Sequence, residues 1–286
     1  MTFEIVPNLS EGRDAAVVDA CAAAMEAAGA RVVHRTSDAA HNRSVITAFG
    51  SAAQTVAAAV ALARETHERI DLRRHGGAHP RMGALDVLPF VPLDDATIED
   101  AVILAHRAAA RIWHEVGIPS FLYGAAASAE HRRSLADARR GEFEGLAAKI
   151  QDPLWHFDYG DAPHATAGAV AIGARPILIA FNVELATGDL SVARHIARTL
   201  RERDGGLATL RALGIRLDAA RVQVSFNVTD HVATPLYRIT ELVRRLASPH
   251  GISVARSELI GLLPKAALET TARAYGMFAD RPIKEK

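Results

Sequence analysis

Two histidines and several arginines lie close together in the run 74–86, which reads Arg-His-Gly-Gly-Ala-His-Pro-Arg-Met-Gly-Ala-Leu-Asp. Imidazole is the only side chain whose ordinary pKa lets it both accept and release a proton near neutrality. Pro80 disfavours a helical conformation for His79, and the Gly-Gly pair disfavours a helix before it, so we expect a loop that leads into an apolar strand. Loops at strand ends commonly carry catalytic groups, which makes this run a candidate acid–base site. A hydrated surface loop is the alternative interpretation.

A metal site is the rival chemical interpretation of the same run. His75 and His79 have the HxxxH spacing that chelates zinc when both side chains lie on one face of a helix. The expected loop removes that geometry, and no glutamate lies between the two histidines. We therefore expect no bound metal.

Composition excludes several classes of partner. The chain has 286 residues, with 33 basic and 33 acidic side chains, so no net field attracts it to nucleic acid or to an anionic membrane. Cys21 is the single cysteine and can form no internal disulfide, which favours a reducing compartment. The N-terminus lacks the pattern of a signal peptide, and the apolar stretches are too short to span a bilayer. We expect a cytoplasmic protein.

Hydrophobic periodicity predicts the same order of elements twice. The first half is expected to contain strands over 3–6, 31–34, 44–49 and 84–91, with helices from Ser10 to Gly29 and from Ser51 to about residue 68. Ser51 and Gln54 form a capping box at the start of the second helix. A helix over 97–116, a strand over 118–123 and a helix over 134–150 extend this half. The predicted order β-α-β-β-α-β is ferredoxin-like.

The second half repeats that order. Strands are expected over 177–183, 207–213, 221–228 and 253–260, with helices over 192–203 and 235–246 and a closing helix from Lys265. Pro235 is predicted at the first helical position. We therefore predict an α/β (α+β) fold of two subdomains, 1–174 and 175–286, each a mixed or antiparallel sheet covered by helices. Ligand sites favour domain interfaces, so a cleft lined by the loops at 35–43, 74–83 and 158–168 is expected.

The run 74–86 resembles the corresponding segment of the glutamate formimidoyltransferases (formiminotransferases), which read close to RHxGxHPRMGALDV. Further motifs match in the same order along the whole chain: Val6 to Arg13, Asn42 to Val45, Leu122 to Gly124, Arg140 to Leu146, Gly173 to Arg175, Ile179 to Asn182, Gln223 to Ser225 with Asn227, and Gly261 to Pro264. The resemblance implies a transferase domain that stands alone, without the cyclodeaminase of the bifunctional animal members.

The resemblance also implies a reaction. The formimino group would pass from N-formimino-L-glutamate to N5 of tetrahydrofolate, a co-substrate, giving 5-formimino-tetrahydrofolate and L-glutamate in histidine degradation and one-carbon metabolism. His79 aligns with the family's acid/base residue. One imidazole can take the proton that N5 sheds and return a proton to the departing nitrogen, contributing about 10²–10⁴-fold.

Binding residues follow from the matched motifs. Both substrates carry carboxylates, which the planar guanidinium binds bidentately, so Arg43, Arg81 and Arg175 are expected to bind substrate. An ion pair within the protein is the alternative for each. Asn42 is expected to orient a substrate amide or to hold the turn before its strand. Asp38 and His75 are candidate orienting residues, with Asp38 directed at His79 or at the pterin ring.

The folate-contacting loop of the family aligns with nine consecutive residues: Gly160, Asp161, Ala162, Pro163, His164, Ala165, Thr166, Ala167 and Gly168. The loop is about one residue shorter than in the animal enzymes and lacks their aromatic residues. Ala125 also replaces a glutamate after Leu-Tyr-Gly, and the acidic residue before Asn-Arg is displaced to Asp38.

Two alternatives to this reaction remain open. The chain can be a transferase of the same fold that uses another formyl or formimino donor, or a non-catalytic folate-binding homologue. The family resemblance is also compatible with a homodimer.

Overall fold

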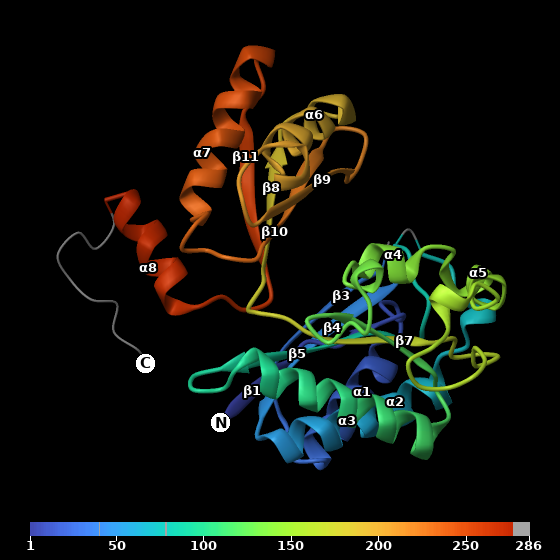
Figure 1. The fold of residues 1–286 in the computed structure, drawn as a ribbon. Coiled ribbons are helices and arrows are strands. Elements are labelled where there is room, and N and C mark those ends of the chain that lie inside the picture. The colour runs from blue at the N-terminus through green and yellow to red at the C-terminus, as the bar shows by residue number, and fades with distance from the viewer. Residues whose placement is uncertain (40, 78, 277–286) are drawn as a thin grey trace. The chain divides into compact units, whose positions relative to one another are not determined.

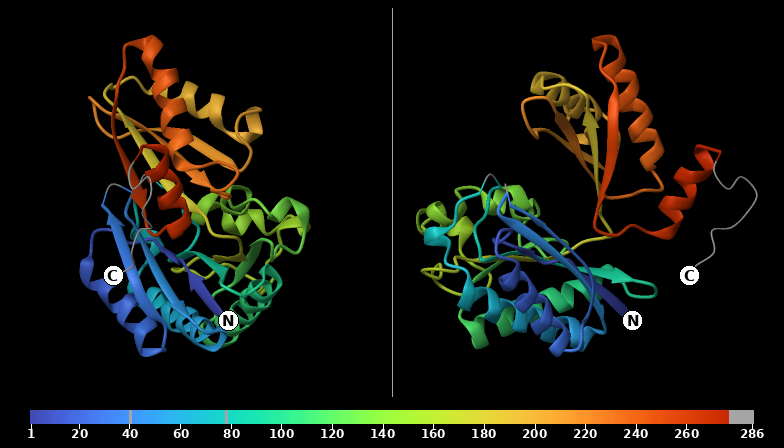
Figure 2. Two further views of the ribbon diagram at one scale, coloured as in Figure 1. Left: turned by 90° about the vertical axis from the view of Figure 1, so that its left-hand side faces the viewer. Right: turned by 180° about the vertical axis from the view of Figure 1, so that it is seen from behind.

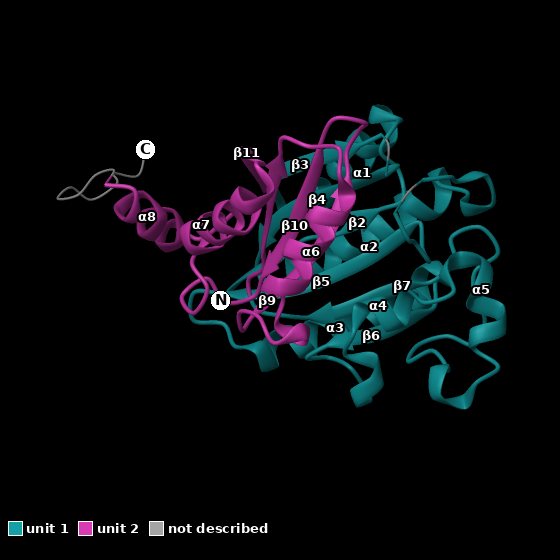
Figure 3. Cartoon of the chain, turned by 90° about the horizontal axis from the view of Figure 1, so that it is seen from above, with its two compact units in different colours: residues 1–176 teal, residues 177–286 magenta. Residues whose placement is uncertain are grey.

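The computed structural model describes residues 1–39, 41–77 and 79–276. The chain divides into two compact units, Met1–Pro176 and Ile177–Lys286 (Figure 3). Each unit has its own sheet, and the two sheets contain seven and four strands among the described residues. The mixed α/β class predicted from the sequence is confirmed.

Unit 1 places its helices on a seven-stranded sheet (Figure 1). Its elements are β1 (Thr2–Ile5), β2 (Asn8–Leu9), α1 (Ala15–Ala27), β3 (Arg31–Asp38), β4 (Arg43–Gly50), α2 (Ala52–Arg69), β5 (Leu85–Leu93), α3 (Ile98–Val116), β6 (Ser120–Gly124), α4 (Leu135–Arg139), α5 (Glu142–Lys149) and β7 (Val170–Ala174).

The order of strands across this sheet is ferredoxin-like with an extension. β3 pairs with β4, and β1 and β2 both lie between β4 and β5, all antiparallel. β7 and then β6 follow beyond β5 as parallel strands. The part from β1 to β5 therefore has the predicted β-α-β-β-α-β order, with its first strand split in two.

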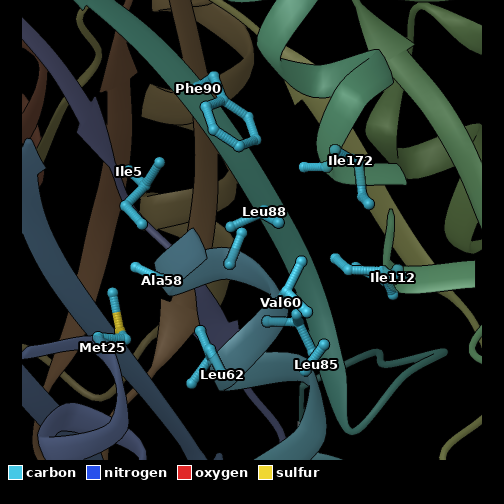
Figure 4. Packing of buried hydrophobic residues seen from close by; sticks show 14 of the residues in the cluster. Ile5, Met25, Ala58, Val60, Leu62, Leu85, Leu88, Phe90, Ile112 and Ile172 are labelled. Carbon is cyan, nitrogen blue, oxygen red and sulfur yellow. The ribbon is translucent and has the colours of Figure 1, made fainter. Parts of the chain in front are cut away.

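One face of the sheet is closed by α1, α2 and α3 (Figure 2). Ile5, Leu62, Leu88, Phe90 and Ile172 interdigitate there (Figure 4) and each is fully buried. Burying an aliphatic or aromatic side chain of this size stabilises the fold by about 1.5–3 kcal/mol. The capping box of α2 is present as predicted, with Gln54 N–H donating to Ser51 Oγ and Ser51 N–H donating to Gln54 Oε1.

The opposite face of the sheet carries a second group of buried apolar residues. A smaller apolar cluster there contains Met82, Val87, Phe121, Tyr123, Leu146, Ala169 and Ala171, so α5 contributes to it through Leu146. The polar residues of the candidate site lie on this face.

Three predictions about unit 1 are wrong. The first helix begins at Ala15 with Asp14 as its N-cap, because Asn8 and Leu9 form β2 and the Ser10 hydroxyl donates to Gly83 O at 2.7 Å. The predicted helix over 134–150 is two helices, since Gly141 adopts φ 93° between them. The prediction also lacked β7, which is buried on both faces and is therefore a short continuous apolar run without the alternation of a half-buried strand.

Unit 2 contains the four-stranded sheet. Its elements are β8 (Ile179–Leu185), α6 (Leu190–Leu200), β9 (Leu210–Arg216), β10 (Val222–Val228), α7 (Leu236–Ala247), β11 (Val254–Ile260) and α8 (Lys265–Ala274). The strands are antiparallel in the order β11-β8-β10-β9, which confirms the predicted β-α-β-β-α-β topology. Pro235 is the N-cap of α7, one position earlier than predicted. Short 3₁₀ turns at Leu72–Arg74, Glu130–Arg132, Pro153–Trp155, Glu202–Asp204 and Ser248–His250 complete the two units.

Candidate active site

A β-bulge aims Asp86 away from the helical layer. Asn8 of β2 is opposite Val87 of β5, but Leu9 is opposite Leu85, so Asp86 is the extra residue between them. Leu85 and Leu88 both face α1–α3, and the bulge turns Asp86 to the other face of the sheet. The side chain is fully buried there, and Met82 N–H donates to its Oδ1 at 2.9 Å.

Two arginines share the other carboxylate oxygen. Arg43 Nη1 on β4 and Arg139 Nη2 at the end of α4 donate to Asp86 Oδ2 at 2.7 and 2.6 Å. Arg43 also donates to Asn8 Oδ1 through Nε at 3.1 Å and Nη2 at 2.7 Å. Burial raises the pKa of Asp86, but the charges of Arg139 and Arg43 outweigh it and hold the pKa at about 2. The carboxylate is therefore ionised throughout the physiological range.

His79 is poised as a neutral base. Its Nδ1 lies 2.7 Å from Pro80 O, and because a carbonyl can only accept, Nδ1 carries the proton and Nε2 keeps a lone pair that no hydrogen bond from the described residues engages. Burial, followed by the charges of Arg43 and Arg139, lowers the pKa of His79 to about 4, against the smaller opposing effects of the Pro80 carbonyl and Asp86. At neutral pH the imidazole can therefore accept a proton.

His75 and Asn42 join the loop before β5 to the turn before β4. Arg81 Nε–H donates to His75 Nδ1 at 3.2 Å, so His75 Nε2–H donates to Asn42 O at 3.0 Å. Asn42 adopts φ 49°, accepts from Gly12 N–H at 2.9 Å through Oδ1 and donates to Gly76 O at 3.3 Å. Both ring nitrogens of His75 are engaged within the protein. His75 and Asn42 thus join the two turns through contacts within the protein, and the orienting role of His75 and the two roles considered for Asn42 stay predictions.

Arg81 is held by carboxylates of the protein itself. Its Nη1 and Nη2 form a bidentate pair with Glu144 at 2.8 and 2.7 Å, and Nη1 also donates to Glu142 at 3.2 Å. Arg81 is only 8% exposed, and the hydrogen bond to Glu144 is the first of the causes that raise its pKa. This arrangement matches the ion-pair alternative for Arg81 and ties α5 to the loop of His79.

Asp38 lies next to the site through a second imidazole. Its carboxylate accepts from His41 N–H at 2.9 Å and lies 2.7 Å from His41 Nδ1. The His41 ring is edge-on to the ring of His79, with centroids 6.1 Å apart. His41 was not among the residues predicted from the sequence, although its three-residue spacing from Asp38, the last residue of β3, is a signal for such a contact.

Arg175 follows β7 directly and lies on the same side as Tyr123. Its N–H donates to Phe90 O at 3.1 Å, and Nη1 donates to Pro176 O at 3.0 Å. Burial raises the pKa of both Tyr123 and Glu4, and the charge of Arg175 lowers each in part. Arg175 is thus a partly exposed cation beside a buried phenol.

The predicted folate loop is fastened to the residues that precede β5. His164 and Gly168 exchange backbone hydrogen bonds at 2.8 and 2.9 Å, and Ala84 N–H donates to Ala167 O at 3.0 Å. His164 Nδ1 accepts from Ala167 N–H at 3.1 Å. Of the nine predicted residues, Asp161, Ala162 and Ala165 are exposed.

The described part of the chain shows neither a cluster of metal-ligating side chains nor a membrane-spanning helix. No group of three or more histidine, cysteine, aspartate or glutamate side chains there could hold a metal ion. Within the same residues, no helix is both long and apolar enough to cross a membrane.

Comparison with known proteins now identifies the class. Residues 2–175 match the model of the formiminotransferase domain, N-terminal subdomain, and residues 180–284 match that of the formiminotransferase domain. The chain therefore belongs to the formiminotransferase family.

Individual relatives agree with that assignment. The chain is 42% identical over 275 residues to the glutamate formimidoyltransferase of Streptococcus pyogenes serotype M1, covering 95% of this chain and 92% of that protein. It is 41% identical to the glutamate formimidoyltransferase of Thermoplasma acidophilum, with coverage of 95% and 91%. It is 39% identical to the formimidoyltransferase-cyclodeaminase of Gallus gallus, over 95% of this chain but only 52% of that longer protein.

Proposed function

We propose that this protein transfers the formimino group from N-formimino-L-glutamate to tetrahydrofolate. One observation carries the proposal: His79 is neutral, has a free Nε2 and lies beside the Arg43–Asp86–Arg139 cluster. A base next to fixed positive charge suits a reaction between a secondary amine and an anionic amidine. Membership of the formiminotransferase family supports the choice of donor and acceptor.

The reaction proceeds by addition and elimination at the formimino carbon. N5 of tetrahydrofolate attacks this carbon, and the π pair of the C=N bond moves to nitrogen, giving a tetrahedral intermediate. His79 Nε2 takes the proton that N5 releases and delivers a proton to the glutamate nitrogen. The bond from that nitrogen to carbon then breaks and the C=N bond re-forms in the product. Proton transfer contributes about 10²–10⁴-fold, and holding two substrates together contributes at least as much.

The remaining site residues receive proposed roles from their contacts. Arg43 and Arg175 bind substrate carboxylates, while Arg81, His75 and Asn42 hold the loop that carries His79. Loop 160–168 contacts the folate through its exposed residues and backbone. Cys21 is the single cysteine and can form no internal disulfide, which supports a reducing, cytoplasmic setting.

The test uses purified protein, tetrahydrofolate and N-formimino-L-glutamate. Product is converted by acid to 5,10-methenyl-tetrahydrofolate and followed by absorbance. We expect turnover by the wild type, a loss of about 10²–10⁴-fold in His79→Ala, and unchanged turnover in His114→Ala, which alters an exposed histidine on α3. Equal turnover in His79→Ala would remove the acid/base role. If neither the wild type nor the variants turn over but the protein binds folate, the protein uses another donor or is a binding protein.

A further inference from the structure

The Arg43–Asp86–Arg139 cluster carries an excess positive charge in a buried setting. The salt bridges of both arginines among the described residues are with Asp86, and both end on the same oxygen. The side chains of Arg43, Asp86 and Arg139 are 10%, 0% and 13% exposed. One carboxylate thus faces two guanidinium groups, which leaves about one positive charge unneutralised. Buried charge is costly unless it is paired, so the cluster is built to receive an anion.

The Arg139 guanidinium has hydrogen-bond donors that the described residues do not use. One of its nitrogens, Nη2, is used by Asp86, whereas Nε is buried and has no hydrogen-bond partner in the described part of the chain. A buried unpaired donor is uncommon because it has lost its hydrogen bonds to water and gained none in return. The fixed fork of a guanidinium matches the two oxygens of a carboxylate. Arg43 differs, since Asn8 and Asp86 already engage three of its nitrogens.

We propose that Arg139, supported by Arg43, binds a carboxylate of the formimino donor, with Asp86 fixing both guanidinium groups before the substrate arrives. This inference rests on the proposed function and names the residue that selects an anionic donor. It differs from the set read from the sequence, because Arg139 was not among those candidates and Arg81 is already engaged by Glu144 and Glu142.

The charge of a donor carboxylate bound at Arg139 would also affect proton transfer by His79. The charges of Arg43 and Arg139 act on His79 to lower its pKa, whereas Asp86 and the Pro80 carbonyl raise it, and burial lowers it most. An anion bound between the arginines would neutralise the excess charge and raise the pKa of His79 toward neutrality. The protonated imidazole would then lose its proton to solvent less readily and would keep it for the leaving nitrogen.

The experiment compares Arg139→Gln and Arg139→Lys with Arg140→Gln. Arg140 is the matched control because it is the next residue, carries the same charge and is 81% exposed, paired with Asp137. Calorimetry measures binding of L-glutamate, and steady-state kinetics measure KM for each substrate. Nuclear magnetic resonance follows the titration of His79 with and without L-glutamate.

We expect L-glutamate binding and donor KM to weaken by about 10- to 100-fold in Arg139→Gln, with an intermediate effect in Arg139→Lys. The KM for tetrahydrofolate should stay within about 2-fold, and added methylguanidinium should partly restore Arg139→Gln. The pKa of His79 should rise when the wild type binds L-glutamate. In Arg139→Gln it should start higher and move less. A merely structural role for Arg139 would not produce this pattern.

Two failures are distinguishable. If Arg139→Gln has the same donor KM as the wild type, or if the wild type does not bind L-glutamate, the proposed carboxylate site is overturned. Binding by the wild type that is lost in Arg139→Gln, without transfer to tetrahydrofolate, would leave the carboxylate site standing and overturn the proposed reaction.

Discussion

Replacing Asp86 by asparagine tests the buried cluster most directly. Asparagine keeps the shape of aspartate but loses the charge, and its amide has only one acceptor oxygen. If that oxygen faces Arg43 and Arg139, the NH₂ group faces Met82 N–H. If it faces Met82, the NH₂ group faces both arginines. Either orientation sets donor against donor.

The magnitude follows from these contacts and from complete burial. The amide oxygen facing Met82 would cost two hydrogen bonds from charged donors at a site with no access to water, each worth about 1.5–3 kcal/mol, and in either orientation the buried negative charge is lost. Breaking a buried ion pair by removing one partner costs about 3–5 kcal/mol. We therefore expect Asp86→Asn to lower the free energy of unfolding by about 3–5 kcal/mol. Asp137→Asn is the control, because Asp137 is 39% exposed and such pairs contribute at most about 1 kcal/mol.

The assay is urea unfolding followed by tryptophan fluorescence. Trp113 and Trp155 are the two tryptophans, and both lie in unit 1, so the signal reports the unit that contains Asp86. The folded-state pKa of Asp86 is lowered to about 2, so its stabilising contribution is complete above its ordinary pKa of about 3.9 and is lost as the pH falls toward 2. The difference between wild type and Asp86→Asn should be constant from about pH 5 to 8 and shrink below about pH 4. A loss no larger than that of Asp137→Asn would refute this reasoning.

Three further outcomes are expected. The pKa of His79 is lowered to about 4, so kcat/KM should stay level as the pH falls from 7 to about 5 and should decline only when the imidazole is protonated. A decline centred near pH 6.5, the ordinary pKa of histidine, would contradict this. In Gly77→Ala the new Cβ would lie 2.2 Å from His41 O, so the loop must shift and activity should fall by about 10- to 100-fold. In Gly76→Ala the new Cβ would meet nothing within 4 Å, so activity should stay within about 2-fold of the wild type. Equal losses in the two variants would argue against a steric cause. Arg81→Lys should lower kcat by about 10-fold through loss of its bidentate pair while donor KM changes less than about 2-fold, and a large rise in donor KM would instead indicate direct substrate binding.

Local signals in the sequence determined most of the secondary structure and the loop of the candidate base. The capping box at Ser51 and the alternating apolar strands of unit 2 depend on residues close in sequence, so they could be read directly. The Gly-Gly and His-Pro steps likewise predicted a loop before β5. The family and its reaction class were also readable, because the matching motifs span the chain. β7 was not predicted because the sheet buries it on both faces, so its sequence is a short apolar run with no alternation of polar and apolar residues.

The electrostatic organisation of the site was decided only by the tertiary structure. Arg43 and Arg139 are 43 and 53 residues from Asp86 in sequence, and a bulge between β2 and β5 sets the face from which Asp86 meets them. The register of two paired strands cannot be read from either strand alone, since a one-residue shift moves a side chain to the other face. For the same reason the sequence could not separate Arg81, held by the protein's own carboxylates, from Arg139, whose buried Nε lacks a partner among the described residues. Residue type set which groups could carry charge, and long-range packing set which of those charges remained unpaired.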